Sequence, residues 1–382
     1  MGAPTAFCAP PVGRGVSLRS TAAAAVGGRL AAAAVATRRR PAPPPAAAAA
    51  GGRRSARMDA AGTDFDDVAR RLAEELGAPA GDGEGGAEGA DKAAAAAATE
   101  NVTVGPGNGG LMRVAMKHPA SNQEVEVYTL GAAVTTWKAR GEDVLWCSKE
   151  NKWDGAKPIR AGIPLCFPQF GPGPLAQHGF ARIANWEVVF AGTLDDGSVQ
   201  TVMTISSDTD NDVIRQWGHA FTAEYAVTLS PTGLEVSLRV VNTGTTAFDF
   251  TAAFHNYFAV TNVAESRVFG VESLPFQDRL ADGATGTEAA DGGAGYLVDK
   301  AVDKLYVGAP EELAVFDFGA LKVLKIKKSA SLPDATLWNP FGEGGCDGGW
   351  KNFVCVEPAA AADKVVLEAG EEWLGAQLLG VE

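Results

Sequence analysis

The sequence predicts an all-β protein: a large antiparallel β-sandwich in one domain, preceded by a disordered N-terminal extension. After about residue 100, runs of alternating or β-branched residues recur, each bounded by Gly, Asp, Asn, Ser or Pro. The chain also holds 46 Gly and 21 Pro, which favours many turns. Hydrophobic residues make up 46% of the chain, enough to fill the core of a sandwich domain of ~280 residues.

The strand-like runs follow one another from residue 125 to residue 356. In order, they are VEVYTLGAAVTTWKA (125–139), WEVVFAGTL (186–194), SVQTVMTISS (198–207), FTAEYAVTLSPTGLEVSLRVVNTG (221–244), FDFTAAFHNYFAV (248–260) and FVCV (353–356). Within the fourth run, AVTLSPTGLEVSL predicts a hairpin with a Pro-Thr-Gly turn. We expect the last run to end at Pro358. Long loops between such strands are expected to carry the chemistry.

Two segments precede the predicted sandwich, which we place at 101–382. Residues 1–58 contain nine Arg and neither Lys nor acidic residues, and they are rich in Ala and Pro. This composition predicts an organelle transit peptide, directed to the chloroplast stroma, with a low-complexity extension of a cytoplasmic protein as the alternative. In 59–100, apolar residues at helical spacing predict a short amphipathic helix, followed by a flexible Gly/Ala/acidic linker.

Charge and cysteine content exclude several classes of function. Removing the nine N-terminal positive charges from the net charge of −13 leaves −22 for residues 59–382. A body this acidic repels phosphate backbones, so nucleic-acid binding is not expected. The five Cys are widely spaced and show no zinc-type spacing. No apolar run is long and bulky enough to span a membrane.

A segment rich in Gly and Pro, IRAGIPLCFPQFGPGPLAQHGFARIANW (159–186), is the first candidate site. It carries Arg160, Gln177, His178 and Arg182. Such a segment predicts a shaped loop, and a guanidinium group offers a planar fork of donors that matches a phosphate or vicinal hydroxyls. Each Arg could instead pair with one of the many acidic residues. The clustering favours a loop that binds an anionic polyol.

Two further residues stand out next to apolar runs. His255 follows FDFTAAF among aromatic residues, where it is either a core histidine or an acid with a pKa tuned near neutrality. Glu357 follows FVCV, where it is either a solvated residue of an edge strand or a buried carboxylate. Burial would raise its pKa and make it a stronger base.

The ordered set IRAGIP, CFPQFG, QHGFAR, WGHAF, FHNYF, DKLY, LWNP, FVCVEP and VVLEAGEEW resembles the glucose-6-phosphate 1-epimerase group of the aldose 1-epimerase superfamily. The resemblance covers about residues 105–380. It implies a large antiparallel sandwich of the galactose-mutarotase type. It also implies an isomerase that interconverts the α and β anomers of D-hexose 6-phosphates.

The resemblance assigns roles residue by residue. It implies that Glu357 removes the proton of the C1 hydroxyl and that His255, when protonated, donates to the ring oxygen. Substrate binding is assigned to Arg160, Gln177, His178, Arg182 and Asp303, with Asp278 as the second choice for the aspartate. The two arginines would hold the 6-phosphate. No cofactor and no metal are implied, and we expect a monomer whose partner is a small-molecule hexose 6-phosphate.

Three other functions stay open at this point. The chain could be a mutarotase for unphosphorylated aldoses, a carbohydrate-binding module without catalysis, or a stromal protein that senses sugar phosphates. FHNYF together with the Val-Glu-Pro of FVCVEP argues against the non-catalytic functions, because both halves of an acid–base pair are present. The two arginines of the 159–186 segment argue for a phosphorylated substrate.

Overall fold

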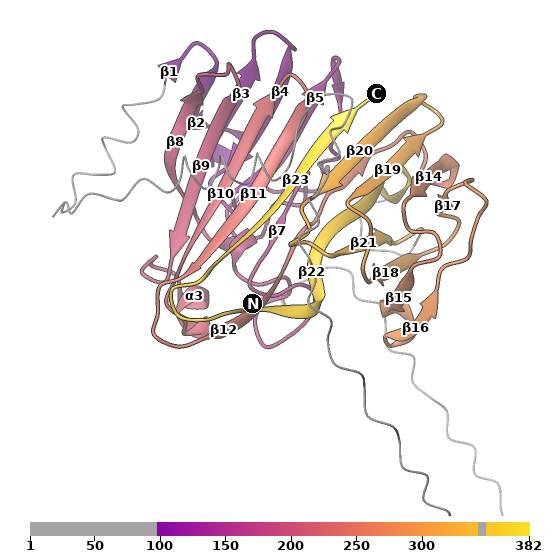
Figure 1. Cartoon of the computed structure of the whole chain (residues 1–382). Helices are drawn as coiled ribbons and strands as arrows, with labels where there is room; N and C mark the ends of the chain where they lie inside the picture. Colours follow the sequence, from indigo (N-terminus) through magenta and orange to yellow (C-terminus); the bar gives the residue numbers. More distant parts are fainter. Residues whose placement is uncertain (1–97, 343–348) are drawn as a thin grey trace, which may run out of the picture.

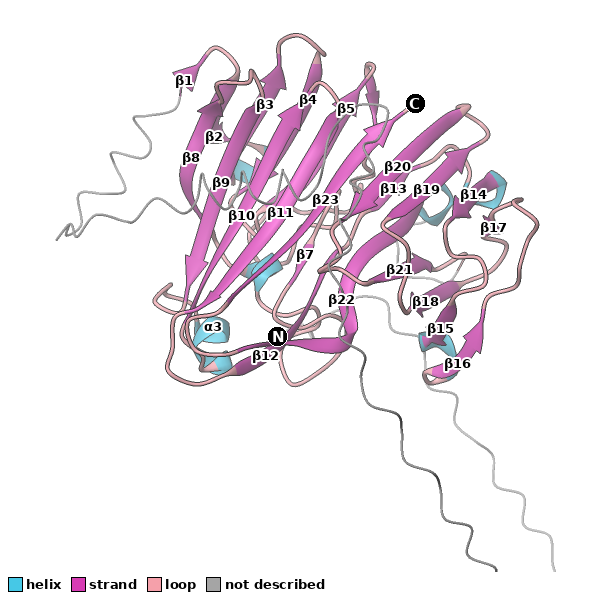
Figure 2. Ribbon diagram, viewed as in Figure 1, coloured by secondary structure: helices cyan, strands magenta, loops and turns pink. Residues whose placement is uncertain are grey.

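A computed structural model describes residues 98–342 and 349–382 of the chain. The predicted transit peptide (1–58) lies outside the described residues, and so does the 59–100 segment up to residue 97. Within the described residues the fold is almost entirely antiparallel β-sheet, as the sequence predicts (Figures 1 and 2). No helix in this part of the chain is long and apolar enough to cross a membrane.

The longest sheet has nine strands, in the spatial order β17-β14-β19-β20-β23-β11-β10-β9-β8. Their bounds are β17 Tyr296–Leu297, β14 Ser266–Phe269, β19 Glu312–Asp317, β20 Lys322–Lys328, β23 Glu372–Val381, β11 Gly233–Asn242, β10 Phe221–Ser230, β9 Val199–Ser206 and β8 Glu187–Thr193. The predicted hairpin is confirmed, because β10 and β11 pair up to Ser230 opposite Gly233 with Pro231 and Thr232 in the turn.

The second sheet has eight strands and carries the candidate catalytic residues. It follows the order β16-β15-β18-β21-β22-β12-β7, and β13 also pairs with β22. The bounds are β16 Ala284–Thr287, β15 Pro275–Asp278, β18 Val302–Tyr306, β21 Asp334–Asn339, β22 Phe353–Leu367, β12 Phe248–Phe254, β7 Leu165–Cys166 and β13 Tyr257–Ala259.

The third sheet is built from consecutive strands near the start of the described chain. Its six strands run in sequence order: β1 Ala98–Thr99, β2 Val102–Pro106, β3 Met112–His118, β4 Gln123–Tyr128, β5 Ala133–Ala139 and β6 Glu142–Asp143. The remaining elements are short: α3 (Asp212–Trp217) and the 3-10 turns η1 (Asn108–Gly110), η2 (Ala181–Ile183), η3 (Val263–Glu265), η4 (Arg279–Ala281) and η5 (Gly349–Asn352).

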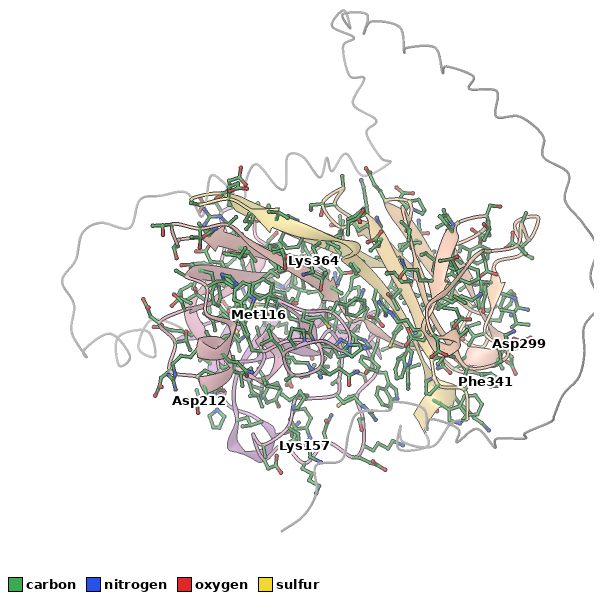
Figure 3. All side chains as sticks on the ribbon, turned by 90° about the horizontal axis from the view of Figure 1, so that it is seen from below. Met116, Lys157, Asp212, Asp299, Phe341 and Lys364 are labelled. Carbon is green, nitrogen blue, oxygen red and sulfur yellow. The ribbon has the colours of Figure 1, made fainter. Side chains whose placement is uncertain are left out.

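One hydrophobic core joins the three sheets. It includes Val114 of β3, Tyr225 of β10 and Val356 of β22, all at most 1% exposed. Strands β2 to β4 pack on β8 to β10. Seen from below, side chains fill the space between the ribbons, and Asp212 and Lys157 lie at the periphery (Figure 3). The six- and eight-stranded sheets therefore cover the nine-stranded sheet as the second layer of a sandwich.

A buried amide pair ties the two layers together beside the candidate site. Asn256, between β12 and β13, and Gln377 of β23 are both 0% exposed. Each donates to the other's side-chain oxygen at 2.8 Å, and Asn256 Nδ2 also donates to the carbonyl of Val356 at 3.0 Å. Because buried amides are costly without partners, this reciprocal pair fixes one arrangement of the three segments.

One prediction about β22 is wrong. The strand does not end at Pro358 but continues to Leu367. Along one edge of β22, the pairing with β13 covers Phe353 to Cys355 of β22. The pairing with β12 along the same edge begins at Ala359 of β22. Proline lacks an N–H group, and Pro358 falls in the gap between these two pairings, so neither ladder loses a hydrogen bond there.

Candidate active site

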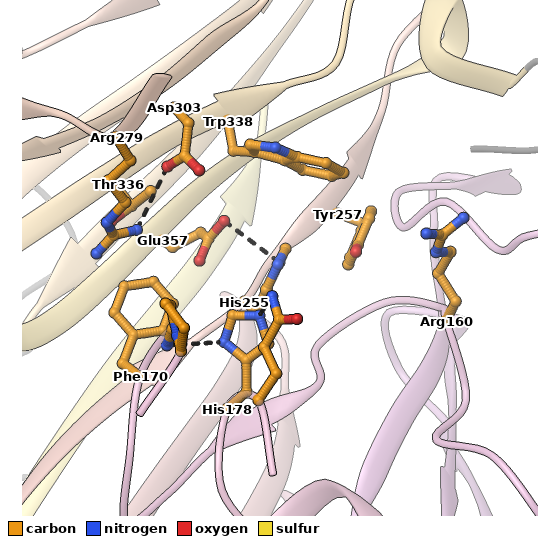
Figure 4. A pocket seen from close by; sticks show the side chains of 13 residues that line it. Arg160, Phe170, His178, His255, Tyr257, Arg279, Asp303, Thr336, Trp338 and Glu357 are labelled. Carbon is orange, nitrogen blue, oxygen red and sulfur yellow. Dashed lines mark hydrogen bonds and ion pairs between the residues drawn. The ribbon is translucent and has the colours of Figure 1, made fainter. Parts of the chain in front are cut away.

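The structure brings His255 and Glu357 into direct contact. His255 lies between β12 and β13, and its backbone N–H donates to the carbonyl of Pro164 at 3.1 Å. Glu357 lies in the middle of β22, opposite Thr336 of β21. The distance from His255 Nδ1 to Glu357 Oε1 is 3.3 Å (Figure 4). Since Glu357 is 1% exposed, it is a buried carboxyl group and not a solvated residue of an edge strand.

Aromatic rings fix the orientation of the His255 imidazole. Tyr257 stacks on it with centroids 4.7 Å apart and planes 3° apart. Trp338 of β21 and the His178 ring meet it edge-on, at 5.8 and 5.5 Å. The ring is thus held against Glu357 by packing on several sides.

Burial moves the pKa values of this pair in opposite directions. It lowers the pKa of His255 to about 3, and the positive charge of Arg182 acts in the same direction. It raises the pKa of Glu357 well above its usual value, and the nearby Arg279 opposes that rise. Since burial disfavours the charged form of each group, the site favours a neutral pair that carries one transferable proton.

The 159–186 segment folds as a loop that closes over this pair. Its short strand β7 pairs with β12 so that Leu165 lies opposite Phe254, the residue before His255. Gly179 has φ +74°, and a Cβ there would lie 2.2 Å from the carbonyl oxygen of Phe167. His178 also has a positive φ of 65°. Two successive left-handed residues make the turn that places the His178 ring beside His255.

His178 is a neutral hydrogen-bond donor in this loop. The backbone N–H of Gly171 donates to its Nδ1 at 3.2 Å, so the proton of the neutral ring lies on Nε2. Burial lowers its pKa well below the usual value, and the charge of Arg182 adds to the effect. His178 therefore offers the N–H of its Nε2 to a sugar oxygen.

These side chains line one pocket of about 540 Å³, open to solvent. Its wall includes six of the predicted site residues: Arg160, Gln177, His178, His255, Asp303 and Glu357. The polar and charged side chains in its wall suit a small polar ligand. The loop, β18 and β22 contribute to one wall although they are far apart in the sequence (Figure 4).

Arg182 is placed differently from the other predicted binding residues. It lies in η2, is 8% exposed, and is not among the side chains that line the pocket. Its Nη2 donates to the carbonyl of Gln177 at 2.5 Å. Arg182 therefore supports the loop backbone next to His178, and its direct contact with a substrate stays a prediction. The second-choice aspartate, Asp278, caps η4 by accepting from Leu280 N–H and is also absent from the wall.

The structure adds wall residues that the sequence reasoning did not single out: Phe170, Pro172, Tyr257, Arg279, Thr336 and Trp338. Three of them belong to motifs noted above, Phe170 to CFPQFG, Tyr257 to FHNYF and Trp338 to LWNP. Arg279 directly follows Asp278 in FQDRL. The sequence points to the aspartate of that motif, but its arginine is the residue that reaches the pocket.

His255 and Glu357 also belong to a candidate set of metal ligands, together with Cys355, which is buried next to the pocket. Among the described residues, His255, Cys355 and Glu357 form one group whose donor atoms lie within 4.8 Å of one another. Nitrogen, sulfur and oxygen donors would suit zinc. A metal bound there would occupy both members of the His255–Glu357 pair. The expectation that no metal is needed stays a prediction, and activity that survives a chelator would support it.

Comparisons with known proteins point in the same direction as the geometry. The family model described as "Aldose 1-epimerase" matches residues 112–379. The chain is 35% identical over 283 residues to a Cenchrus ciliaris protein named "Putative glucose-6-phosphate 1-epimerase", covering 70% of this chain and 83% of the relative. An Escherichia coli K12 protein of the same name is 30% identical over 246 residues, covering 61% and 78%.

Solved structures show the same fold. A Salmonella typhimurium protein titled "putative mutarotase" matches with a TM-score of 0.65 and 25% identity, over 75% of this chain and 95% of that chain. Galactose 1-epimerase from Lactobacillus acidophilus matches with a TM-score of 0.56 and 13% identity, over 74% and 98%.

Proposed function

The chain belongs to the aldose 1-epimerase family, and from that premise we propose that it interconverts the α and β anomers of D-glucose 6-phosphate and related hexose 6-phosphates. The observation that carries the proposal is the buried His255–Glu357 contact of 3.3 Å at the floor of a pocket that also presents arginine side chains. A relative that is 35% identical bears the name of this activity.

The reaction needs one base and one acid at the anomeric centre. Glu357 accepts the proton of the C1 hydroxyl while His255 gives its proton to the ring oxygen, so the C1–ring oxygen bond breaks and the open aldehyde forms. Rotation about the C1–C2 bond then presents the other face of the aldehyde. Ring closure reverses both transfers, so protons and electrons balance over the cycle. Each positioned group contributes roughly 10²–10⁴-fold to the rate.

The pair holds the right number of protons for this cycle. A neutral Glu357 with a neutral His255 carries the same single transferable proton as the ionised pair, carboxylate with imidazolium. The 3.3 Å between His255 Nδ1 and Glu357 Oε1 brings the two groups close enough to share one proton over the cycle, although these atoms form no hydrogen bond in the free protein. Arg279 favours the carboxylate form of Glu357, which supports its role as the base.

Substrate binding is assigned to the polar residues of the wall. Arg160 binds the 6-phosphate, because guanidinium and phosphate match in charge and geometry. Gln177 and Asp303 bind hydroxyl groups, and His178 donates from Nε2 to a sugar oxygen. Arg182 acts by holding the carbonyl of Gln177 and so keeps the loop in shape.

The test is the rate of mutarotation of freshly dissolved α-glucose 6-phosphate, followed by polarimetry or by a dehydrogenase that consumes the β anomer. We expect the protein to accelerate anomerisation well above the spontaneous rate, and to act more efficiently on glucose 6-phosphate than on glucose or galactose. Preference for an unphosphorylated aldose would replace the proposal with the free-aldose mutarotase. Saturable sugar binding without any acceleration would make the protein a carbohydrate-binding module.

We propose further that the enzyme works in the chloroplast stroma as a monomer. The Arg-rich, acid-free residues 1–58 support import. Import of the full chain into isolated chloroplasts, with removal of an N-terminal segment, would test the location. Light scattering of the processed protein would test the monomer.

A further inference from the structure

Arg279 contacts two other residues of the pocket wall, Asp303 and Phe170. It begins η4, directly after β15. Its Nη1 lies 3.4 Å from Oδ1 of Asp303 on β18. Its guanidinium group also lies over the ring of Phe170, 4.6 Å from the centroid, and Phe170 belongs to the 159–186 loop. Because the stacking and the ion pair restrain the guanidinium plane, its remaining N–H groups have a fixed direction.

Arg279 and Arg160 lie on opposite sides of the His255–Glu357 pair. Figure 4 shows Arg279 and Asp303 beside Glu357, and Arg160 beyond Tyr257 on the side of His255. Arg160 and Arg279 are the two guanidinium groups among the described residues that line this pocket. A bound sugar with its C1 at the pair therefore has an arginine on either side.

The chemistry of a pyranose orients it between these arginines. One ring neighbour of C1 is the ring oxygen, which leads to C5 and then to C6 with its phosphate. The other neighbour is C2, which carries a hydroxyl and leads to C3 with another. Since His255 gives its proton to the ring oxygen, the phosphate side points toward Arg160. The C2 and C3 hydroxyls then point toward Glu357, Asp303 and Arg279.

Charge supports the same orientation. The acidic residues in the described pocket wall are Asp303 and Glu357, and both lie on the Arg279 side (Figure 4). A phosphate dianion at Arg279 would be repelled by Asp303, which already pairs with that arginine. A hydroxyl group has no such penalty, because it can donate to the carboxylate and accept from the guanidinium group at once.

We infer that Arg279 and Asp303 together form the binding site for the C2 hydroxyl and its C3 neighbour, and that Arg279 thereby determines specificity for the sugar's C2 configuration. The inference rests on the proposed function, because it takes C1 to lie at the His255–Glu357 pair. It adds a residue that the predicted binding set lacks.

The test compares two substrates that differ by one hydroxyl group. We expect Arg279→Met to lower kcat/KM for glucose 6-phosphate about tenfold to hundredfold, the usual size of a lost hydrogen bond to a charged group. For 2-deoxyglucose 6-phosphate, which lacks the C2 hydroxyl, we expect a loss about tenfold smaller, which reflects only the weaker support of the Glu357 carboxylate. Asp303→Asn should show the same dependence on the C2 hydroxyl.

A matched control is Arg267→Met on β14. Arg267 also lies over a phenylalanine ring, Phe318, at 5.7 Å, but it is not among the pocket residues. Its substitution should leave kcat/KM for both sugars unchanged. Circular dichroism and the unfolding temperature of each variant would show that the fold is retained.

Two results would overturn the inference, and they differ from failure of the proposed function. Equal loss on both substrates in Arg279→Met would mean that the arginine acts only through structure or through the charge of Glu357, and not on the C2 hydroxyl. A larger KM effect on phosphorylated than on free glucose in Arg279→Met would move the phosphate to Arg279. If the unmodified protein accelerates neither sugar phosphate, the proposed function itself fails and the inference fails with it.

Discussion

The proposed acid–base pair and the two arginines of the pocket wall are held by different parts of the fold. Glu357 lies in β22 of the eight-stranded sheet, and His255 lies in the link between its strands β12 and β13. Both are at most 8% exposed and are held by the flanking strand pairing and by the buried amide pair beside them. Arg160 and Arg279 lie outside the strands, at the ends of the pocket, and are partly exposed. The comparison suggests that the sheet sets the chemistry, whereas the loops choose the substrate.

The largest effect should come from the sheet-borne pair. We expect Glu357→Gln and His255→Asn each to lower kcat by about 10²–10⁴-fold, because each removes one proton-transfer group. Binding of glucose 6-phosphate, measured by calorimetry, should remain within about threefold, the size expected when only a transition-state contact is lost. Full activity in either variant would end the assignment of that residue.

The second effect should distinguish the arginines of the loop. We expect Arg160→Met to raise KM for glucose 6-phosphate about tenfold to hundredfold while leaving KM for free glucose nearly unchanged. From its bond to the Gln177 carbonyl, we expect Arg182→Met to impair both substrates alike. If Arg182→Met impaired only the reaction of the phosphorylated sugar, Arg182 would bind the phosphate, as the sequence predicts.

A smaller effect should follow from disturbing the amide pair below the site. We expect Gln377→Met to lower kcat about tenfold, with KM little changed, and to cost about 1–3 kcal/mol of unfolding free energy because Asn256 loses its partner. Gln200→Met on β9 is the matched control, since Gln200 is a buried amide bonded to Thr228 far from the pocket. It should cost stability without changing kcat. An equal fall of kcat in both variants would show a general loss of folding.

The smallest effect concerns stability and pH. Because burial raises the pKa of Glu357, the carboxyl group favours folding below its usual pKa, and that contribution is lost as the pH rises through the raised value. The amide introduced by Glu357→Gln stays neutral at every pH. We therefore expect this variant to melt at a higher temperature than the unmodified protein at pH 7, with the advantage shrinking toward pH 4. An advantage that grows on acidification would contradict the raised pKa.

The sequence predicted the sheet-borne residues better than the loop-borne ones, for a physical reason. Alternating apolar residues indicate a strand, so the runs FDFTAAF and FVCV point to His255 and Glu357 as candidates at their ends, while the family resemblance supplies the proposed roles. Arg182 and Arg279 lie in the short turns η2 and η4, where apolar and polar residues do not alternate regularly. Whether each reaches the pocket depends on contacts with Gln177, Asp303 and Phe170 that sequence spacing does not show.

The prediction that β22 ends at Pro358 failed for a related reason. Local preference takes proline as the end of a strand, but the partners of the strand decide whether its missing N–H matters. Here Pro358 falls in the gap between the pairings with β13 and β12. The gap depends on how β12 and β13 each pair with β22, so the motif FVCVEP alone does not predict it.

The most direct test of the central claim is the kcat of the double variant His255→Asn/Glu357→Gln, measured with glucose 6-phosphate beside both single variants. If one shared proton moves between the two residues, removing either disables both, and the double variant should be no slower than the slower single variant by more than about threefold. If the losses of the two single variants multiply in the double variant, the residues act independently, and the account of a single proton-sharing pair is wrong.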